Sequence, residues 1–311
     1  MLLALSLLAI TWWLATMDMV PGPADWTPGP DLSIYPWIYL RDGAPVSGET
    51  PVSLIVVGDV MPGRGVSGER NPLGSAAPWL RGADLTLGNL EAVVAPEGPA
   101  RATTPGEDGP YILSAPAAAT EWLAGAGFDL MGLANNHSLD YGVAGLTGTA
   151  GLLEAAGMTV LGAGSGDRTY RPLIREVRDV RLAFLAFNAV PDPAPGVQPA
   201  AAAWQIAAWD EARAVAAVAE ARQQAEAVVV SLHWGQEYAL RAAPWQREAA
   251  QALVQAGADL VIGHHPHVVQ EVDAPAGKRW SPIAWGISFL TRVAPIQGRG
   301  WPCARFSTTR G

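Results

Sequence analysis

The sequence predicts an α/β fold built in layers, with sheets flanked by helices. Short apolar runs of strand length alternate with longer segments that are rich in Ala, Leu, Gln and Glu and carry apolar residues three and four positions apart. The short runs are continuously apolar, which is typical of strands covered on both faces by helices or by a second sheet. No internal repeat of roughly 20 to 50 residues is visible.

Residues 52–290 are expected to form this domain. The predicted strands are bounded by Gly, Asn or His and lie at Ser53–Val57, Asp84–Leu87, Asp129–Leu133, Leu182–Phe187, Ala227–Leu232 and Asp259–Ile262. The predicted helices follow the 3.6-residue period and lie at Ala117–Ala126, Val143–Ala156, Trp209–Glu226 and Trp245–Ala256. Gly142 is expected to begin the second helix.

Residues 1–17 are predicted to be a signal peptide or membrane anchor, because Leu2–Ala15 is apolar apart from two hydroxyl residues. No Lys or Arg precedes this run, and it is shorter than the roughly 20 residues of a spanning helix, so a buried helix is the alternative. Residues 18–51 are Pro-rich without a sustained period and are expected to be a linker. The apolar segment at residues 1–17 predicts an exported protein, which is either anchored on the outer face of the cytoplasmic membrane or secreted.

Charge and cysteine content exclude several classes of protein. The formal net charge is −9 and no cluster of Lys and Arg is present, which excludes a general nucleic-acid-binding protein. An anionic ligand would therefore need a bound metal or a local basic pocket. The single cysteine, Cys303, excludes an internal disulfide framework and a thiolate metal cluster.

Potential metal ligands follow five of the predicted strands. They are Asp59 in GDVMPGR, Asn89 and Glu91 in GNLE, Asn136 and His137 in NNHSLDYG, His233 in HWG, and His264, His265 and His267 in GHHPH. Because the carboxyl ends of strands form the ligand crevice of an open α/β sheet, residues far apart in sequence can converge there. All five histidines of the chain lie in these motifs. Carboxylate and amide oxygens with imidazole nitrogens are ligands of divalent metals.

These motifs stand in the order and context of the CapA family of bacterial capsule and poly-γ-glutamate synthesis proteins, which the chain resembles over roughly Val52–Asp273. That family is similar in turn to the calcineurin-like metallophosphatases, whose motifs also follow strands and end in an Asn-His pair, a lone His and a final His-x-His. One such motif is a weak signal, but five in order are a specific one. The resemblance implies a layered, metallophosphatase-like α/β fold.

The resemblance also implies one or two divalent ions of Mn, Mg, Zn or Fe. The implied metal-facing residues are Asp59, Glu91, Asn136, His233, His265 and His267. Asn136 and His137 are implied in catalysis, with His137 beside the metals as general acid or transition-state stabiliser. Arg64, just after the first motif, is the nearest cation for an anionic substrate, and a surface role is its alternative.

The chain departs from the metallophosphatase pattern in two places. Met61 stands where a phosphatase has the His of Asp-x-His, and a thioether is a poor ligand for Mn, Mg or Zn. Glu91 replaces the usual bridging Asp. These departures leave open a single-ion site and a domain that does not catalyse hydrolysis.

Several assignments have alternatives. His264 is the alternative to His265, although alternate residues of an extended segment point the same way and favour His265 with His267. His137 is alternatively a structural residue of its turn, and Asn89 a turn residue without a ligand role.

Two further positions are open as well. Glu237 and Arg241 are most simply a solvent-facing pair one helical turn apart, or else they line a substrate pocket. Trp234 is the tryptophan expected near the site.

The resemblance implies a protein of capsule or poly-γ-glutamate biosynthesis, export or anchoring with a metal-dependent phosphoesterase-like site. The alternatives are a non-catalytic, polymer-binding accessory subunit of a membrane synthase and a generic metal-dependent phosphoesterase. The Asn136 and His137 pair favours catalysis, whereas Met61 favours binding alone. The expected partners are an anionic surface polymer or its precursor, subunits of a membrane synthase and the membrane, but no nucleic acid.

Residues 291–311 are predicted to be an irregular tail, after a domain that is incomplete at its C-terminal side. The family normally continues with a segment resembling Tyr-Ser-Leu-Gly-Asn-Phe and an Asp-Gln pair, where this chain reads PIAWGISFLTR. Read one nucleotide out of frame, degenerate codons for Pro282–Phe289 can spell that segment, and those for Leu290–Arg292 the Asp-Gln pair. We therefore expect a frame-shifted reading, with a divergent native tail as the alternative, and resequencing these codons distinguishes them.

Overall fold

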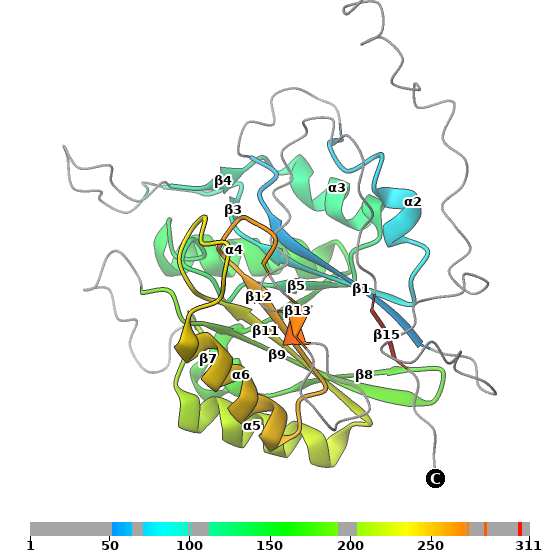
Figure 1. Ribbon diagram of the computed structural model, residues 1–311. Helices are drawn as coiled ribbons and strands as arrows, with labels where there is room; N and C mark the ends of the chain where they lie inside the picture. The colour runs from blue at the N-terminus through cyan, green and yellow to red at the C-terminus, as the bar shows by residue number, and fades with distance from the viewer. Residues whose placement is uncertain are drawn as a thin grey trace, which may run out of the picture.

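Two mixed sheets face each other in the computed structural model, with helices on their outer sides (Figure 1). The structure describes residues 52–63, 71–98, 100, 112–191 and 204–270, and the short C-terminal strands 272–273, 283–284 and 304–306. The α/β class with sheets flanked by helices is confirmed. The predicted anchor and linker at 1–51, and Arg64, lie outside the described residues.

The first sheet has the strand order β15-β1-β2-β5-β6 within the described ranges. Its parallel strands are β1 (Val52–Val60), β2 (Leu85–Leu90), β5 (Leu130–Gly132) and β6 (Thr159–Leu161), and β15 (Ala304–Phe306) pairs antiparallel with β1. Helices α2 (Ala77–Leu80), α3 (Ala118–Ala126) and α4 (Gly142–Ala155) cover its outer face. Helix α3 ends at Gly127, whose φ of 96° is the left-handed conformation that glycine adopts without strain.

The second sheet has the order β13-β14-β12-β11-β9-β8 over the part of the chain that is described. Its strands are β8 (Leu173–Val177), β9 (Val180–Asn188), β11 (Ala227–His233), β12 (Leu260–His264), β13 (Val272–Asp273) and β14 (Ile283–Ala284). Helices α5 (Glu211–Gln224) and α6 (Pro244–Ala256) cover its outer face. The Asp210 side chain caps α5 by accepting from the Arg213 N–H, and Pro244 begins α6.

Shorter elements lie outside the two large sheets. Strands β3 (Val93–Val94) and β4 (Ser114–Ala115) pair in parallel, and β7 (Ala163–Ser165) pairs antiparallel with β10 (Trp204–Ile206). A short 3-10 helix, η2 (Gly166–Tyr170), follows β7. No helix in the described ranges has both the length and the hydropathy needed to cross a membrane.

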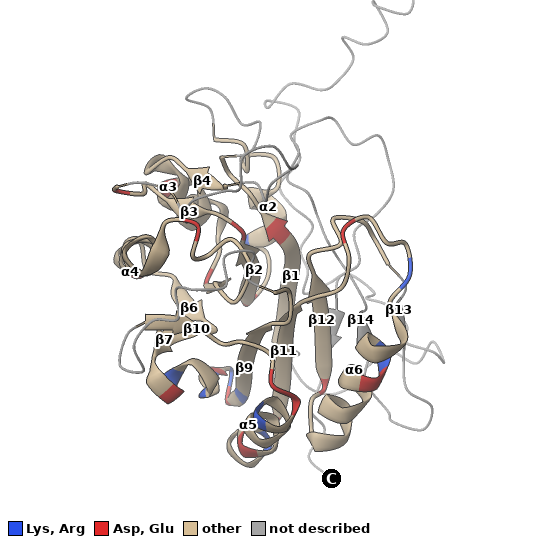
Figure 2. Ribbon diagram, turned by 90° about the vertical axis from the view of Figure 1, so that its left-hand side faces the viewer, with Lys and Arg blue, Asp and Glu red and all other residues tan. Residues whose placement is uncertain are grey.

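Alternate residues of the central strands belong to different hydrophobic layers. In β11, Val228 and Val230 pack under the helices of the second sheet, whereas Val229 packs between the sheets. In β9, Phe187 lies on the helix side and Phe184 on the inner side. This arrangement explains why the strands read as continuously apolar, since both of their faces are buried. Charged residues accordingly lie mainly on the helices and loops, as the blue and red segments of Figure 2 show.

The strands and helices predicted from periodicity all occur, and Gly142 begins α4 as expected. The strands that carry site residues extend further than predicted, because β11 includes His233 and β12 includes His264. Of the tail at 291–311, the structure describes Ala304–Phe306, which forms β15 although the sequence shows no strand period there. The rest of that tail lies outside the described residues.

Candidate metal centre

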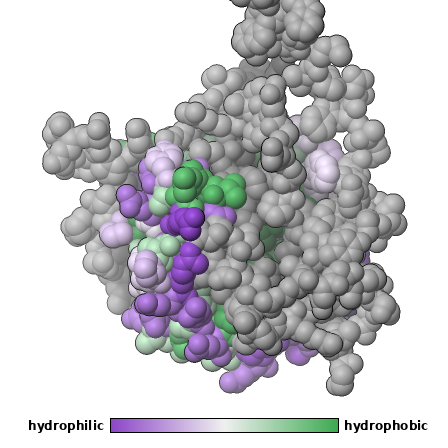
Figure 3. Space-filling model, in the orientation of Figure 1, coloured by the Kyte–Doolittle hydropathy of each residue, from purple (hydrophilic) through white to green (hydrophobic). Residues whose placement is uncertain are grey.

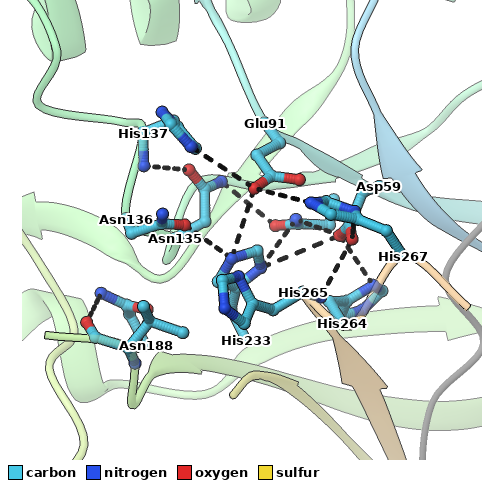
Figure 4. A network of polar contacts seen from close by, with 12 residues as sticks. Asp59, Glu91, Asn135, Asn136, His137, Asn188, His233, His264, His265 and His267 are labelled. Carbon is cyan, nitrogen blue, oxygen red and sulfur yellow. Dashed lines mark hydrogen bonds and ion pairs between the residues drawn. The ribbon is translucent and has the colours of Figure 1, made fainter. Parts of the chain in front are cut away.

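The residues predicted for the site, apart from Arg64, come together where the carboxyl ends of the two sheets meet (Figure 4). The first sheet contributes Asp59 from β1, Asn89 and Glu91 from the end of β2, and Asn136 and His137 from the loop after β5; the second contributes His233 from β11 and His264, His265 and His267 from β12 and the loop after it. All of these side chains are buried except that of Asn136, which is half-buried. The strand-end positions therefore build one buried polar cluster from both sheets.

Asp59 is held by contacts to both of its oxygens. Oδ1 accepts a hydrogen bond of 2.8 Å from Nδ2 of Asn89, and Oδ2 accepts one of 2.9 Å from the backbone N–H of His265. Nδ1 of His267 lies 3.1 Å from Oδ2. Burial alone would raise the pKa of Asp59, but the close contact with Nδ1 of His267 and the surrounding imidazoles outweigh it and hold this pKa well below its usual range. Asp59 is therefore a carboxylate.

Glu91 lies at the centre of the histidines. Its Oε1 is 3.5 Å from Nε2 of His233, 3.8 Å from Nε2 of His137 and 3.9 Å from Nε2 of His267. The three rings reach Glu91 from three separate loops or strands (Figure 4). One carboxylate oxygen thus faces three imidazole nitrogens.

Three groups of residues in the described part of the chain place ligand atoms within 4.8 Å of one another. The groups are Asp59 with Glu91 and His267, Glu91 with His233 and His265, and Glu237 with His265 and His267. The first two are buried and share Glu91. The two buried groups therefore meet at one carboxylate, that of Glu91.

The protonation of the histidines suits metal binding. Burial lowers the pKa of His233 well below its usual range, and it lowers that of His265 to about 4. Both rings are therefore neutral at pH 7, which is the form of imidazole that binds a metal ion. Nδ1 of His265 is also buried without a hydrogen-bond partner among the described residues. Two carboxylates and neutral imidazoles fit a divalent metal.

His137 is oriented by its own loop. Its Nδ1 lies 2.8 Å from Oδ2 of Asp140, and that oxygen also accepts a hydrogen bond of 2.7 Å from the Leu113 N–H. An acceptor at Nδ1 assigns the proton to that nitrogen and leaves Nε2 facing Glu91. The structural role considered for His137 therefore coexists with a place at the site.

Asparagines contribute contacts that the sequence did not predict. Asn89 bonds to Asp59 and lies 3.2 Å from Nδ1 of His233, so it is more than a turn residue. Asn136 Oδ1 lies 2.7 Å from Nε2 of His233. Asn135 organises the loop, because its side chain donates to the Leu90 carbonyl and accepts from the His137 N–H. The doubled asparagine of NNH was the only sequence signal for that role.

The GHHPH histidines reach the site in a different way from the predicted one. Strand β12 ends at His264, and His265 and His267 then adopt φ values of 91° and 55°. Left-handed backbone, and not the alternation of an extended segment, therefore sets their directions, and such strain is typical of functional sites. His264 Nδ1 lies 3.5 Å from Oδ1 of Asp59, but His264 belongs to none of the three groups.

Met61 and Trp234 have different surroundings. Met61, directly after β1, is buried in the hydrophobic layer between the first sheet and its helices, whereas Asp59 of β1 belongs to a metal group. Trp234 follows His233 directly and packs edge-to-face on Trp245 of α6, with ring centroids 5.7 Å apart. It supports the strand end that carries His233.

Glu237 lies at the exposed edge of the site. It stands in a turn between β11 and α6 and not on a helix, so the predicted helical spacing to Arg241 is wrong. The neighbouring loops expose Tyr238, Leu240 and Val269. Figure 3 shows hydrophobic side chains beside hydrophilic ones on the described surface where these loops lie. The buried centre thus borders a surface that is partly apolar.

Known proteins resemble this chain over most of its length. A family model described as bacterial capsule synthesis protein PGA_cap matches residues 53–288. The capsule biosynthesis protein CapA of Bacillus anthracis is 31% identical over 267 residues, which covers 80% of this chain and 61% of the relative. The PGA biosynthesis protein CapA of Bacillus subtilis is 31% identical over 241 residues, which covers 73% of this chain and 60% of the relative.

The chain spans about three fifths of the length of these curated relatives. Among solved structures, a hypothetical protein from Thermus thermophilus superposes with a TM-score of 0.47 at 18% identity and covers 76% of each chain. The family match includes every motif that contributes to the buried cluster, from Asp59 to His267. The chain therefore belongs to the PGA_cap family of bacterial capsule synthesis proteins.

Proposed function

We propose that this chain is a CapA-like protein of capsule or poly-γ-glutamate biosynthesis, export or anchoring, with a metal-dependent phosphoesterase-like site. The observation that carries the proposal is the pair of buried ligand groups that share Glu91. Their ligands come from strand ends in two sheets, an arrangement that packing alone does not require. The names of the Bacillus relatives support the biosynthetic context.

The side chains have distinct roles in such a reaction. A divalent ion bound there would act as a Lewis acid and lower the pKa of a bound water. Asp59 and Glu91 supply the charge that holds a cation, and His233, His265 and His267 supply imidazole nitrogens. His137, fixed through Nδ1 by Asp140, presents Nε2 toward the centre, and as an imidazolium, with its second proton on Nε2, it could donate that proton to a leaving oxygen.

The substrate side of the proposal is an anionic surface polymer or its phosphorylated precursor. The net charge of −9 disfavours anions over the surface at large, so a bound cation would supply the local attraction. Subunits of a membrane synthase and a place on the outer face of the cytoplasmic membrane belong to the same proposal. Arg64 remains its candidate residue for contact with the anion.

A second candidate function is that of an accessory subunit that binds polymer without turnover. Met61 favours it, because this residue packs in the hydrophobic core and leaves Asp59 as the ligand from β1. The exposed apolar side chains beside the site are also suited to a partner. In this case the metal would organise the polymer-binding surface.

Turnover of generic phosphomonoesters and phosphodiesters with Mn²⁺, Mg²⁺ or Zn²⁺ separates the two candidates. We expect hydrolysis that depends on metal and falls at least about 100-fold in His137→Ala, because a lost proton donor typically costs that much. Glu248→Gln, an exposed change on α6, is the control and should keep full activity. Metal binding without turnover in the parent protein would instead favour the accessory subunit.

A further inference from the structure

The buried centre needs a route by which a cation can enter it. Asp59 and Glu91 are fully buried, and His265 and His267 are each only 6% exposed. Glu237, in contrast, is exposed and shares a group with these two histidines. Exposure therefore falls stepwise from Glu237 through the two histidines to the carboxylates of the centre.

We infer that Glu237, His265 and His267 form an entry position, where a divalent cation such as Mn²⁺, Co²⁺ or Zn²⁺ binds from solvent before it passes to the buried groups. This inference rests on the proposed metal centre and assigns a further residue to it. A carboxylate and two imidazoles, with one side open to water, are a donor set for such ions.

The position is more than an exposed acid near histidines. Nδ1 of His265 is buried and has no hydrogen-bond partner among the described residues, so this ring nitrogen is available to a ligand. The ligand atoms of the three residues lie within 4.8 Å of one another.

The two loops that carry these residues are joined by hydrogen bonds at the two positions that follow Glu237. The Tyr238 N–H donates to the Pro266 carbonyl at 2.7 Å, and Nε2 of Gln270 donates to the Ala239 carbonyl at 2.6 Å. Tyr238 adopts a left-handed φ of 61°, which a tyrosine accepts only when its surroundings enforce it. The backbone at Glu237 is thus held against the His265–His267 loop.

Shared ligands make this position a stage on the route and not a third permanent site. Each neutral imidazole has one lone pair for a cation. His267 also belongs to the group of Asp59 and Glu91, and His265 to the group of Glu91 and His233. A cation at the entry position must therefore give up its histidines when the buried groups fill.

Metal uptake kinetics test this inference. Metal-free protein is mixed with Co²⁺ in a stopped-flow instrument, and the absorbance of the bound ion is followed to its end point. We expect Glu237→Gln to take up Co²⁺ at least about tenfold more slowly than the parent, with the same final stoichiometry, because local charge of the opposite sign speeds association by at least about that factor. Glu237→Asp, which keeps the carboxylate, should recover part of the rate, and Glu248→Gln should match the parent because it removes only an exposed charge on α6.

Two other outcomes would overturn the inference in distinguishable ways. An unchanged uptake rate in Glu237→Gln, together with lost metal in His233→Ala, removes the entry position and leaves the proposed centre intact. A parent protein that takes up no divalent ion removes the centre and the entry position together. Because Glu237 is exposed, Glu237→Gln should keep the parent's circular dichroism and melting temperature.

Discussion

Burial and close polar contacts together set the protonation of single residues in the site. Burial lowers the pKa of His233, His264 and His265, which favours neutral rings, while the close contact with His267 helps keep Asp59 ionised against the effect of its own burial. The neutral rings are ready for a metal, but they make the metal-free protein sensitive to acid. As the pH falls, these histidines take up protons in the unfolded chain before they do so in the folded one, which lowers the free energy of unfolding.

The first prediction concerns this sensitivity. His265 has a folded pKa of about 4 and an ordinary value of 6.5, so the unfolded state binds the proton first as the pH falls. In protein kept metal-free by a chelator, this group should leave the free energy of unfolding unchanged above pH about 6.5. It should lower that free energy by up to about 3 kcal/mol as the pH falls toward 4. Urea titrations of the parent and His265→Gln check this, and the variant should show the flatter profile. Parallel profiles would show that His265 titrates normally in the folded protein.

Acidic residues mark the beginnings of strands in both sheets. Each stands at or just before the start of a parallel strand and accepts the backbone N–H of a residue at the start of the neighbouring strand: Asp84 from Ser53, Asp129 from Thr86, Glu226 from Arg181 and Asp259 from Val228, at 2.7 to 2.8 Å. The backbone N–H of each acidic residue donates in return to the carbonyl of the same partner. These side chains complete the hydrogen bonding at the edge of the sheets opposite the site.

A second prediction tests this hydrogen bonding between an acidic side chain and the neighbouring strand, at β1 and β2. Asp84→Ala removes the acceptor of both the N–H and the hydroxyl of Ser53, so we expect the free energy of unfolding to fall by about 1–3 kcal/mol. Asp167→Ala is the control, since the Asp167 side chain is 91% exposed and pairs with Arg213 at the surface. Its effect should stay within about 0.5 kcal/mol. Equal stabilities of Asp84→Ala and Asp167→Ala in urea would argue against a stabilising role for these acidic residues.

At the scale of the whole molecule, the two sheets each hold part of the proposed metal centre. Asp59, Glu91 and His137 belong to the first sheet, while His233 and the GHHPH histidines belong to the second. The layer between the sheets therefore sets how the two sets of ligands meet. Residues of that layer should influence metal binding although they belong to no ligand group.

The third prediction compares two phenylalanines of β9 that face opposite layers. Phe184 lies between the sheets and Phe187 under helix α5, and both are fully buried. Each change to Ala should cost about 3–5 kcal/mol of stability. Phe184→Ala should also weaken metal binding measured by calorimetry, whereas Phe187→Ala should weaken it less. Equal metal affinities in the two variants would mean that the inner layer does not align the ligands.

The fourth prediction concerns the segment before the domain. As a proposal, residues 1–17 direct the chain to the membrane, so the full chain should sediment with membranes, while a variant without residues 1–30 stays in the soluble fraction. Immunoblots of the two fractions check this. Both forms in the soluble cytoplasmic fraction would remove the anchor from the proposal.

The sequence by itself determined the layered α/β class, the main strands and helices, and the positions where ligands follow strands. Those properties are local: apolar runs reveal strands buried on both faces, and ligand-type residues at strand ends reveal the crevice. The order of the five motifs also indicated the family, and the family match at 53–288 confirms it. Neither inference needed a contact between distant residues.

Only the tertiary structure decided which side chains meet. Asp59 bonds to the backbone of His265, 206 residues away, and Glu91 faces rings from the opposite sheet. Met61 turns into the core, and Glu237 groups with two histidines. No local pattern encodes these outcomes, because they depend on how the two sheets stack. They also depend on the left-handed backbone of His265, which is held by the packing of its own loop and of the loop that carries Glu237.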